Sequence, residues 1–291
     1  MNKRFFSALL VLSSLSATAQ TSYQSGIDSW HKQRIADLKK ENGWLNLAGL
    51  LWLQPGKNSF GGGQQAQLKF PAGTIADNAG YFELKENTVW LHTNESTKVQ
   101  VNGVIKNDVV IFSTDSARPA ICSYDHLRWT IIKREDKIGI RLRDLESKEL
   151  KKFSGIDRFP VDSTFKVTAF LQKPFAPSIP ITNVLGQTNE QTTAGKLSFA
   201  LQGKQYTLDA LDEGDELFII FGDATSGNET YPSGRFLYAK KPGADGYTIV
   251  DFNKSYNPPC AFTPYATCPL PPRQNILPVA INAGEKNYGH H

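Results

Sequence analysis

The residues best suited to chemistry collect between Asp223 and Pro272. This segment contains carboxylates, an arginine, amides and tyrosines beside a proline-rich stretch that holds two cysteines. An arginine can hold negative charge, while carboxylates and amides exchange hydrogen bonds with a polar ligand. The predicted ligand-binding residues are Glu229, Tyr231, Arg235, Asp251, Asn253, Tyr256 and Asn257.

The segment predicts an ordered loop, because it has too many prolines for a helix or a central strand and too many apolar residues for a disordered linker. Long ordered loops are disproportionately functional. One interpretation is therefore a cleft with aromatic walls that binds a small polar or anionic ligand. The alternative is a structural cover over a sheet edge, in which Arg235 pairs with Glu229 or Asp251.

A hydrolase is the second functional interpretation. Glu229 or Asp251 would act as general acid or base, and Arg235 would hold an anionic group. Cys260 would be the nucleophile in its reduced form. No set of side chains has the spacing of a known catalytic constellation, so binding without catalysis is the preferred hypothesis.

The three cysteines predict one disulfide and one buried thiol. Cys260 and Cys268 lie close together and are the natural pair in an oxidising compartment, whereas Cys122 is expected to be a small core residue. Zinc requires about four nitrogen or sulfur ligands at clustered spacing, and no second pair accompanies these cysteines. The sequence predicts no metal and no cofactor.

The N-terminus predicts an export signal at residues 1–19. Lys3 and Arg4 precede a short apolar run, and Ala17-Thr18-Ala19 supplies the small residues of a cleavage site. The apolar run is far shorter than the roughly 20 residues of a membrane-spanning helix. We expect cleavage after Ala19 and a soluble exported protein, periplasmic or secreted, with no lipid anchor and no membrane span.

Composition excludes several classes of protein. The chain has 291 residues, with 32 Lys and Arg against 28 Asp and Glu, and a formal net charge of +4. So small a charge excludes a protein whose main partner is nucleic acid. A hydrophobic fraction of 40% with 11% aromatic residues excludes wholesale disorder and coiled-coil composition.

One helix and many short strands must position the candidate residues. Residues 25–42 predict an amphipathic helix, with Ser25 as its cap and Gly43 as its stop. After Gly43, short runs of β-branched and aromatic residues alternate with turn residues such as Asn102-Gly103. The pattern predicts a mainly β protein with antiparallel sandwich or barrel sheets, preceded by one helix.

The best domain boundary lies near residues 151–159, where the first series of predicted strands ends. The predicted parts are a signal peptide (1–19), a helix with a β-sandwich-like part (20–150) and a C-terminal β part with the proline- and cysteine-rich loop (151–291). The run Gly61-Gly62-Gly63 predicts a flexible hairpin loop, because no helix follows it to bind a dinucleotide.

The chain resembles the family catalogued as domain of unknown function 1684, from Trp30 to Lys286. The segments that carry the resemblance are Gly43–Leu53 with Pro55-Gly56, Phe159–Asp162, Gly222–Gly227, Glu229–Tyr231, Gly234–Leu237, Asp251–Asn253, Tyr256–Phe262, Ala266–Pro271 and Ala283–Lys286. The resemblance implies kinship and no activity. Members that look cytoplasmic carry the same two cysteines, so a thiol site is a second interpretation of Cys260 and Cys268.

A further resemblance covers Asn58 to Phe112. Its glycine loop, short strands and Val101-Asn-Gly-Val104 are similar to a forkhead-associated β-sandwich. The resemblance implies at most a shared sandwich topology, because the loop lacks the phosphate-binding arginine of that family. Binding of phosphothreonine is therefore not expected.

Overall fold

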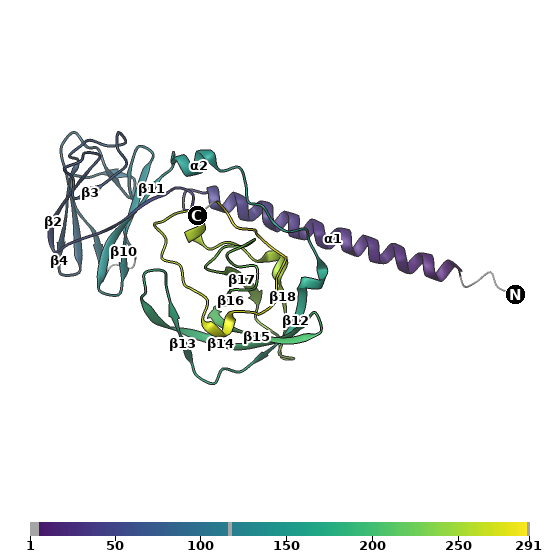
Figure 1. Ribbon diagram of the computed structural model, residues 1–291. Coiled ribbons are helices and arrows are strands. Elements are labelled where there is room, and N and C mark those ends of the chain that lie inside the picture. Colours follow the sequence, from purple (N-terminus) through teal and green to yellow (C-terminus); the bar gives the residue numbers. More distant parts are fainter. Residues whose placement is uncertain (1–5, 116–117, 290–291) are drawn as a thin grey trace. The chain divides into compact units, whose positions relative to one another are not determined.

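The computed structural model describes residues 6–115 and 118–289, with side chains from Thr21 onward. One long helix, α1 (Phe6–Lys39), precedes a chain that consists mainly of antiparallel strands (Figure 1). The predicted mainly β class is therefore confirmed. The chain divides into two compact units. Unit 1 comprises Met1–Asp37, Ser154–Phe262 and Thr267–His291, and unit 2 comprises Leu38–Phe153 and Thr263–Ala266.

Helix α1 begins earlier than the predicted helix at residues 25–42. No glycine or proline interrupts the sequence from Phe6 to Gln24, so no residue in this stretch breaks the helix. Ser25 lies in the helix interior, where its backbone oxygen accepts a hydrogen bond from Ser29 Oγ (2.9 Å). The prediction that Ser25 caps the helix is wrong. After Lys39 the chain turns, and Gly43 N donates to Lys40 O (2.7 Å).

Part of the predicted signal peptide, residues 1–5, lies outside the described residues, and residues 6–19 form the beginning of α1. In the part of the chain that the structure describes, no helix has the length and apolar character needed to cross a membrane. Cleavage after Ala19 stays a prediction.

Unit 2 is formed by two sheets around one core. The six-stranded sheet has the order β1-β11-β10-β9-β6-β7, and the five-stranded sheet has the order β3-β2-β4-β5-β8. The strands are β1 (Leu47–Trp52), β2 (Gly56–Gly61), β3 (Leu68–Lys69), β4 (Gly80–Lys85), β5 (Thr88–Thr93), β6 (Gln100–Val101), β7 (Val104–Ile105), β8 (Asp108–Ser113), β9 (Cys122–Tyr124), β10 (Leu127–Arg134) and β11 (Lys137–Asp144). A short helix, α2 (Lys148–Lys152), follows them.

Alternation along the strands builds the core of unit 2. On β10, Leu127, Trp129 and Ile131 are buried, whereas the residues between them are partly exposed. Phe60 lies at the centre of an aromatic cluster, with its ring centroid 4.5 Å from that of Phe82. Each large side chain buried in this way stabilises the fold by about 1.5–3 kcal/mol.

The glycine run after β2 is not a hairpin loop, and this prediction is wrong. Strand β2 pairs in parallel with β3, so the chain between them crosses over instead of turning back. A Cβ atom on Gly61 would lie 2.7 Å from the backbone oxygen of Ala76. The glycines are therefore required by close backbone packing.

Unit 1 is a strongly curved sheet with the order β17-β16-β15-β14-β12-β18, and β13 pairs with β14. Thr248 Oγ1 donates to Lys240 O (2.6 Å), which links β18 to β17 and leaves the sheet nearly closed. The strands are β12 (Lys166–Gln172), β13 (Ser178–Thr182), β14 (Thr188–Leu201), β15 (Lys204–Glu213), β16 (Glu216–Phe221), β17 (Arg235–Lys240) and β18 (Tyr247–Asp251). The sheet encloses a core that includes Phe199, Phe221 and Phe252.

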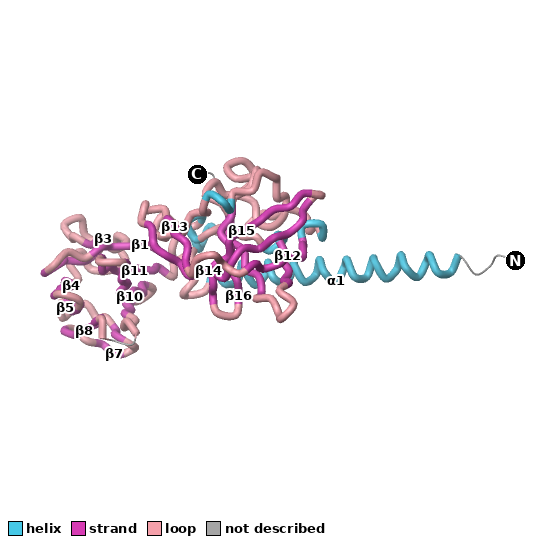
Figure 2. Tube along the Cα trace, turned by 90° about the horizontal axis from the view of Figure 1, so that it is seen from below, coloured by secondary structure: helices cyan, strands magenta, loops and turns pink. Residues whose placement is uncertain are grey.

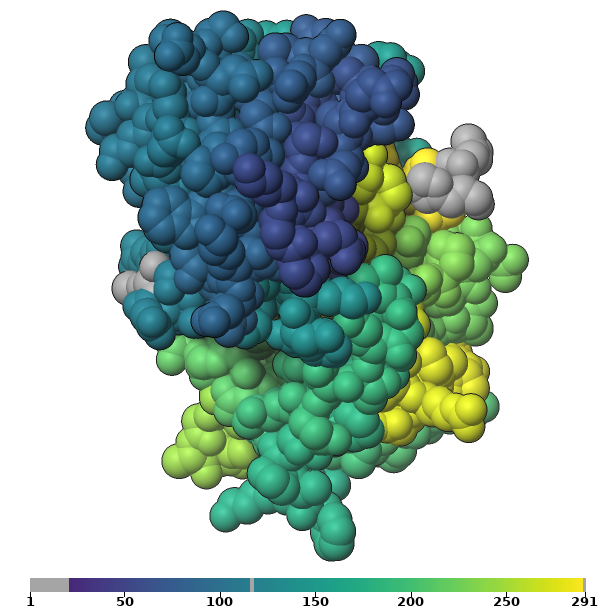
Figure 3. Space-filling model, turned by 90° about the vertical axis from the view of Figure 1, so that its left-hand side faces the viewer, coloured from purple at the N-terminus to yellow at the C-terminus, as the bar shows by residue number. Residues whose placement is uncertain are grey.

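The β13–β14 region carries an exposed aromatic side chain. Residues around 170–190, teal-green in Figure 3, project from the surface. Phe175, in the loop before β13, is fully exposed. Because its ring is surrounded by solvent, replacing Phe175 by alanine is a matched control for replacing a phenylalanine of the core.

After β18 the chain contains only loops and short 3₁₀ turns as far as the described residues extend (Figure 2). The turns are η2 (Phe252–Lys254), η3 (Pro259–Ala261) and η4 (Arg273–Asn275), and a further turn, η1 (Ser163–Phe165), precedes β12. A disulfide joins Cys260 to Cys268, with their Cα atoms 6.1 Å apart. Cys122 is a buried free thiol, and burial raises its pKa to about 12. The predicted cysteine pairing is therefore confirmed.

Candidate functional site

Arg235, predicted to bind a ligand, is instead fully buried at the start of β17. Its Nη2 atom donates to Asp223 Oδ2 (2.9 Å) and to the backbone oxygen of Ile281 (2.9 Å). Its Nη1 atom donates to the backbone oxygens of Ala283 and Glu285. The arginine therefore joins β17 to the C-terminal loop and pairs with Asp223 rather than with the predicted Glu229 or Asp251.

Asn257 and Tyr256 belong to a second internal network. Glu285 Oε2 accepts hydrogen bonds from the Asn257 backbone N (2.7 Å) and from its Nδ2 (3.1 Å). Arg34 of α1 places Nε 3.4 Å from Glu285 Oε1 and its guanidinium 4.5 Å from the centre of the Tyr256 ring. Burial raises the pKa of Glu285, with Arg34 opposing the shift. These contacts attach α1 to the loop that follows β18.

Asp251 and Asn253 form a third network, around Tyr23 of α1. Tyr23 donates its hydroxyl to Asp251 Oδ1 (2.8 Å) and accepts from Asn253 Nδ2 (3.0 Å). Asn253 Nδ2 also donates to the backbone oxygen of Asp162 (2.8 Å). Burial, followed by the hydrogen bond to Asp251, raises the pKa of the Tyr23 phenol.

The predicted residues therefore do not gather in one cavity. Glu229 is exposed and Tyr231 is half-buried, whereas Arg235, Asn253 and Asn257 are buried in internal hydrogen-bond networks, and those of Arg235 and Asn257 share Glu285. Of the seven predicted residues, only Asp251 is among those that line a groove of unit 1 between α1 and the sheet. Their hydrogen bonds correspond to the structural alternative, in which polar side chains in a loop satisfy one another.

That groove has a volume of about 750 Å³ and lies between α1 and the sheet of unit 1. Helix α1 runs beside β18 and β12 in Figure 1. The residues that line the groove come from α1 and from strands β12, β16, β17 and β18, with η2 at one end. They are Tyr23, Gly26, Ile27, Trp30, Lys166, Glu216, Tyr238, Ala239, Lys240, Lys241, Tyr247, Thr248, Ile249, Asp251 and Lys254.

Strand alternation places aromatic and apolar side chains on the wall of this groove. On β18, Tyr247 and Ile249 are exposed to 55% and 44%, whereas Thr248 and Val250 are buried between them. Tyr238 of β17 is also exposed, and Trp30 contributes the aromatic side chain on the helix side. The groove thus has apolar walls that remain open to solvent.

Lysines outnumber carboxylates among the residues that line the groove. Lys240 pairs with Glu216 (2.8 Å), and Lys241 pairs with Asp212 outside the groove (2.6 Å). Lys166 and Lys254 have no carboxylate partner among the described side chains, and Lys166 Nζ lies 4.9 Å from the centre of the Tyr23 ring. These two lysines leave an attractive site for an anion.

Sequence reasoning missed the aromatic and cationic residues of the groove. Their signal was present in the alternation of exposed and buried residues on β17 and β18. That alternation does not distinguish a strand that lines a groove from one that faces open solvent. Nothing in the sequence indicated that α1 lies against these strands. Within residues 6–115 and 118–289, no group of His, Cys, Asp and Glu side chains is arranged to hold a metal ion.

Comparison with known proteins links one part of the chain to a family. Residues 151–286 match the family described as "Protein of unknown function (DUF1684)". The predicted resemblance extended from Trp30, so the match covers its C-terminal part only. The forkhead-associated resemblance stays a prediction.

One similar solved structure is an uncharacterised protein from Haloarcula marismortui, determined by NMR. The two sequences are 30% identical, the alignment covers 48% of this chain and 80% of that chain, and the TM-score is 0.41. No curated protein matches the chain.

Proposed function

We propose that unit 1 binds a small anion with a planar apolar body in the groove between α1 and its sheet. One observation carries the proposal: exposed aromatic side chains and two lysines without carboxylate partners line the same groove. The volume of about 750 Å³ is that of a site for a small molecule and not for a single ion.

The chemistry of the walls favours this class of ligand. Aromatic rings such as those of Tyr247 and Trp30 offer large apolar faces to a planar body. Lys166 and Lys254 favour a carboxylate, phosphate or sulfonate group on that body. Asp251 Oδ1 is occupied by Tyr23, which leaves Oδ2 as an acceptor for a ligand hydroxyl or amine.

The hydrolase hypothesis has less support. The Cys260 thiol is part of a disulfide and cannot act as a nucleophile in that state. Glu229 does not line the groove, and the two carboxylates that do, Glu216 and Asp251, are engaged by Lys240 and Tyr23. Binding without catalysis therefore fits the groove better.

The test is a fluorescence titration of the full chain with 4-nitrobenzoate, a planar anion whose nitro group quenches tryptophan emission. We expect saturable quenching, because Trp30 lines the groove, and loss of most of that quenching in Trp30→Phe. The uncharged 4-nitrobenzamide is expected to bind more weakly. Linear quenching that is the same in the wild type and in Trp30→Phe would overturn the proposal.

We further expect the protein to act outside the cytoplasm. The signal pattern at residues 1–19 supports export, and the Cys260–Cys268 disulfide is the kind of bond that oxidising compartments retain. N-terminal sequencing of exported material should begin at or near Gln20. Exported protein that still carries Met1 would contradict a cleaved signal.

A further inference from the structure

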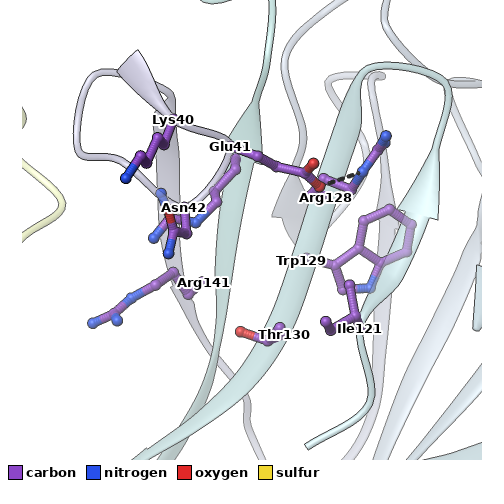
Figure 4. Close-up of a pocket in the computed structure, with 9 residues that line it drawn as sticks. Lys40, Glu41, Asn42, Ile121, Arg128, Trp129, Thr130 and Arg141 are labelled. Carbon is purple, nitrogen blue, oxygen red and sulfur yellow. Dashed lines mark hydrogen bonds and ion pairs between the residues drawn. The ribbon is translucent and has the colours of Figure 1, made fainter. Parts of the chain in front are cut away.

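Unit 2 contains a pocket of about 580 Å³ on its six-stranded sheet, separate from the groove described above. Its walls come from the loop after α1 and from strands β10 and β11 (Figure 4). Four cationic side chains line it, and they face a single carboxylate. The cations are Lys40, Arg128, Arg141 and Arg143, and the carboxylate is Glu41.

Strand register brings the arginines together. Arg128 lies opposite Arg143 in the pairing of β10 with β11, and Thr130 lies opposite Arg141. Because side chains two residues apart share one face, Arg141 and Arg143 lie side by side on β11. Like charges placed directly opposite each other destabilise a sheet, so this arrangement needs a compensating partner.

Two of the arginines are already engaged by the protein. Arg128 Nε pairs with Glu41 Oε1 (2.9 Å), and its Nη1 donates to the backbone oxygen of Asp125 (2.6 Å). Arg143 Nη1 donates to Asn46 Oδ1 (2.7 Å) and to the backbone oxygen of Gly43. These contacts hold the loop after α1 against the sheet, and Glu41 is the one carboxylate that lines the pocket beside the three arginines.

Arg141 is different, because it makes no hydrogen bond or ion pair with the described residues. Its Nε atom is buried without a partner, and its guanidinium lies 5.7 Å from the centre of the Trp44 ring. Burial, and then Arg134, lowers the pKa of Arg141, while burial and then Arg141 lower the pKa of Arg143 to about 10. A buried N–H donor without an acceptor is costly.

We propose that this pocket binds a small molecule that carries a doubly charged oxyanion, either a dicarboxylate or a phosphate monoester. The guanidinium of Arg141 presents a planar fork of donors that matches paired oxygen atoms. Even without Lys40, the three arginines against Glu41 leave two positive charges, which favours a divalent over a monovalent anion.

The rest of the pocket fits an organic body on the anion. In Figure 4, Lys40, Asn42 and Arg141 lie away from the Arg128–Glu41 ion pair. Thr130 adds a hydroxyl to the lining, and Ile121, exposed to 57%, offers an apolar contact. The volume is that of a small-molecule site rather than of a bare ion.

The test is a titration of the full chain, labelled with ¹⁵N at arginine, with glycerol 2-phosphate and separately with succinate. We expect one of them to shift the guanidinium N–H resonances of Arg141 saturably, because Arg141 lines the pocket and its guanidinium would gain an acceptor. The probe that binds more tightly identifies the source of the oxyanion. Sodium chloride at equal ionic strength is the control, and shifts no larger than those it causes with either probe would overturn the proposal.

Variants give a second readout by calorimetry. Arg141→Gln should weaken binding of the preferred probe at least tenfold, and Arg141→Lys, which keeps the charge and loses the fork, should weaken it less. Arg273→Gln, an equal change of charge at an exposed position in unit 1, should leave binding unchanged. Unchanged affinity in Arg141→Gln would contradict the proposal, and amide spectra establish that each variant is folded.

Discussion

Replacing Arg235 by methionine is expected to destabilise unit 1 by about 3–5 kcal/mol, because it removes one partner of a buried ion pair and keeps the other. The side chains of Arg235 and Asp223 are exposed to 0% and 1%, so the carboxylate would be left buried without its counter-ion. The backbone oxygens of Ile281, Ala283 and Glu285 would lose their donor as well. Each loss adds to the cost of the substitution.

Urea unfolding of wild type and Arg235→Met measures this loss. Arg273→Met, at an exposed arginine of the same unit, is the matched control and should change the free energy of unfolding by about 0.5 kcal/mol or less. Binding of 4-nitrobenzoate to folded Arg235→Met should equal that of the wild type. A stable variant that has lost binding would show that Arg235 is a ligand residue after all.

Replacing Phe60 by alanine is expected to destabilise unit 2 by about 3–5 kcal/mol, because it removes a large buried ring and leaves a cavity. Phe60 is fully buried, and its ring centroid lies 5.2 Å from that of Phe70 and 6.3 Å from that of Trp129. The rings of Phe70 and Trp129 are themselves packed in the core, so they cannot move far enough to fill the cavity that the Phe60 ring leaves.

Phe175→Ala is the matched control, because the same atoms are removed from a fully exposed position. Its effect on the free energy of unfolding should stay within about 0.5 kcal/mol. Both variants can be compared by thermal or urea unfolding, followed by near-ultraviolet circular dichroism. A Phe60→Ala variant as stable as Phe175→Ala would contradict the core described for unit 2.

The sequence predicted the architecture well because alternation along strands is a local signal. The short runs of β-branched and aromatic residues after Gly43 were expected to be strands, and strands such as β10 and β18 consist of such runs. The Asn102-Gly103 turn joins β6 to β7, with positive φ at both residues. The hairpin loop predicted for residues 61–63 was wrong, because glycine is needed there to make room for the backbone of Ala76 and Asp77, which is distant in sequence.

The candidate site was less predictable, because its geometry depends on contacts distant in sequence. Arg235 looked like a ligand residue, but its partners Asp223, Ile281 and Ala283 reach it only in the folded chain. The groove depends on α1 lying against β18, which no pattern in either segment indicates. The disulfide was predictable, since Cys260 and Cys268 are close in sequence.

Lysines in the groove of unit 1 are proposed to hold the anionic group of a ligand. The most direct test is the dissociation constant of 4-nitrobenzoate for the double variant Lys166→Gln and Lys254→Gln. The matched control changes Lys173 and Lys204, exposed lysines of unit 1 outside the groove, to glutamine.

We predict that the groove variant binds roughly tenfold or more weakly than the wild type, since each charge contributes up to about a factor of five. The control variant should bind within about a factor of two of the wild type, because its charges are distant and screened. Equal affinity of the groove variant and the control variant would show that Lys166 and Lys254 do not hold the anionic group of the ligand.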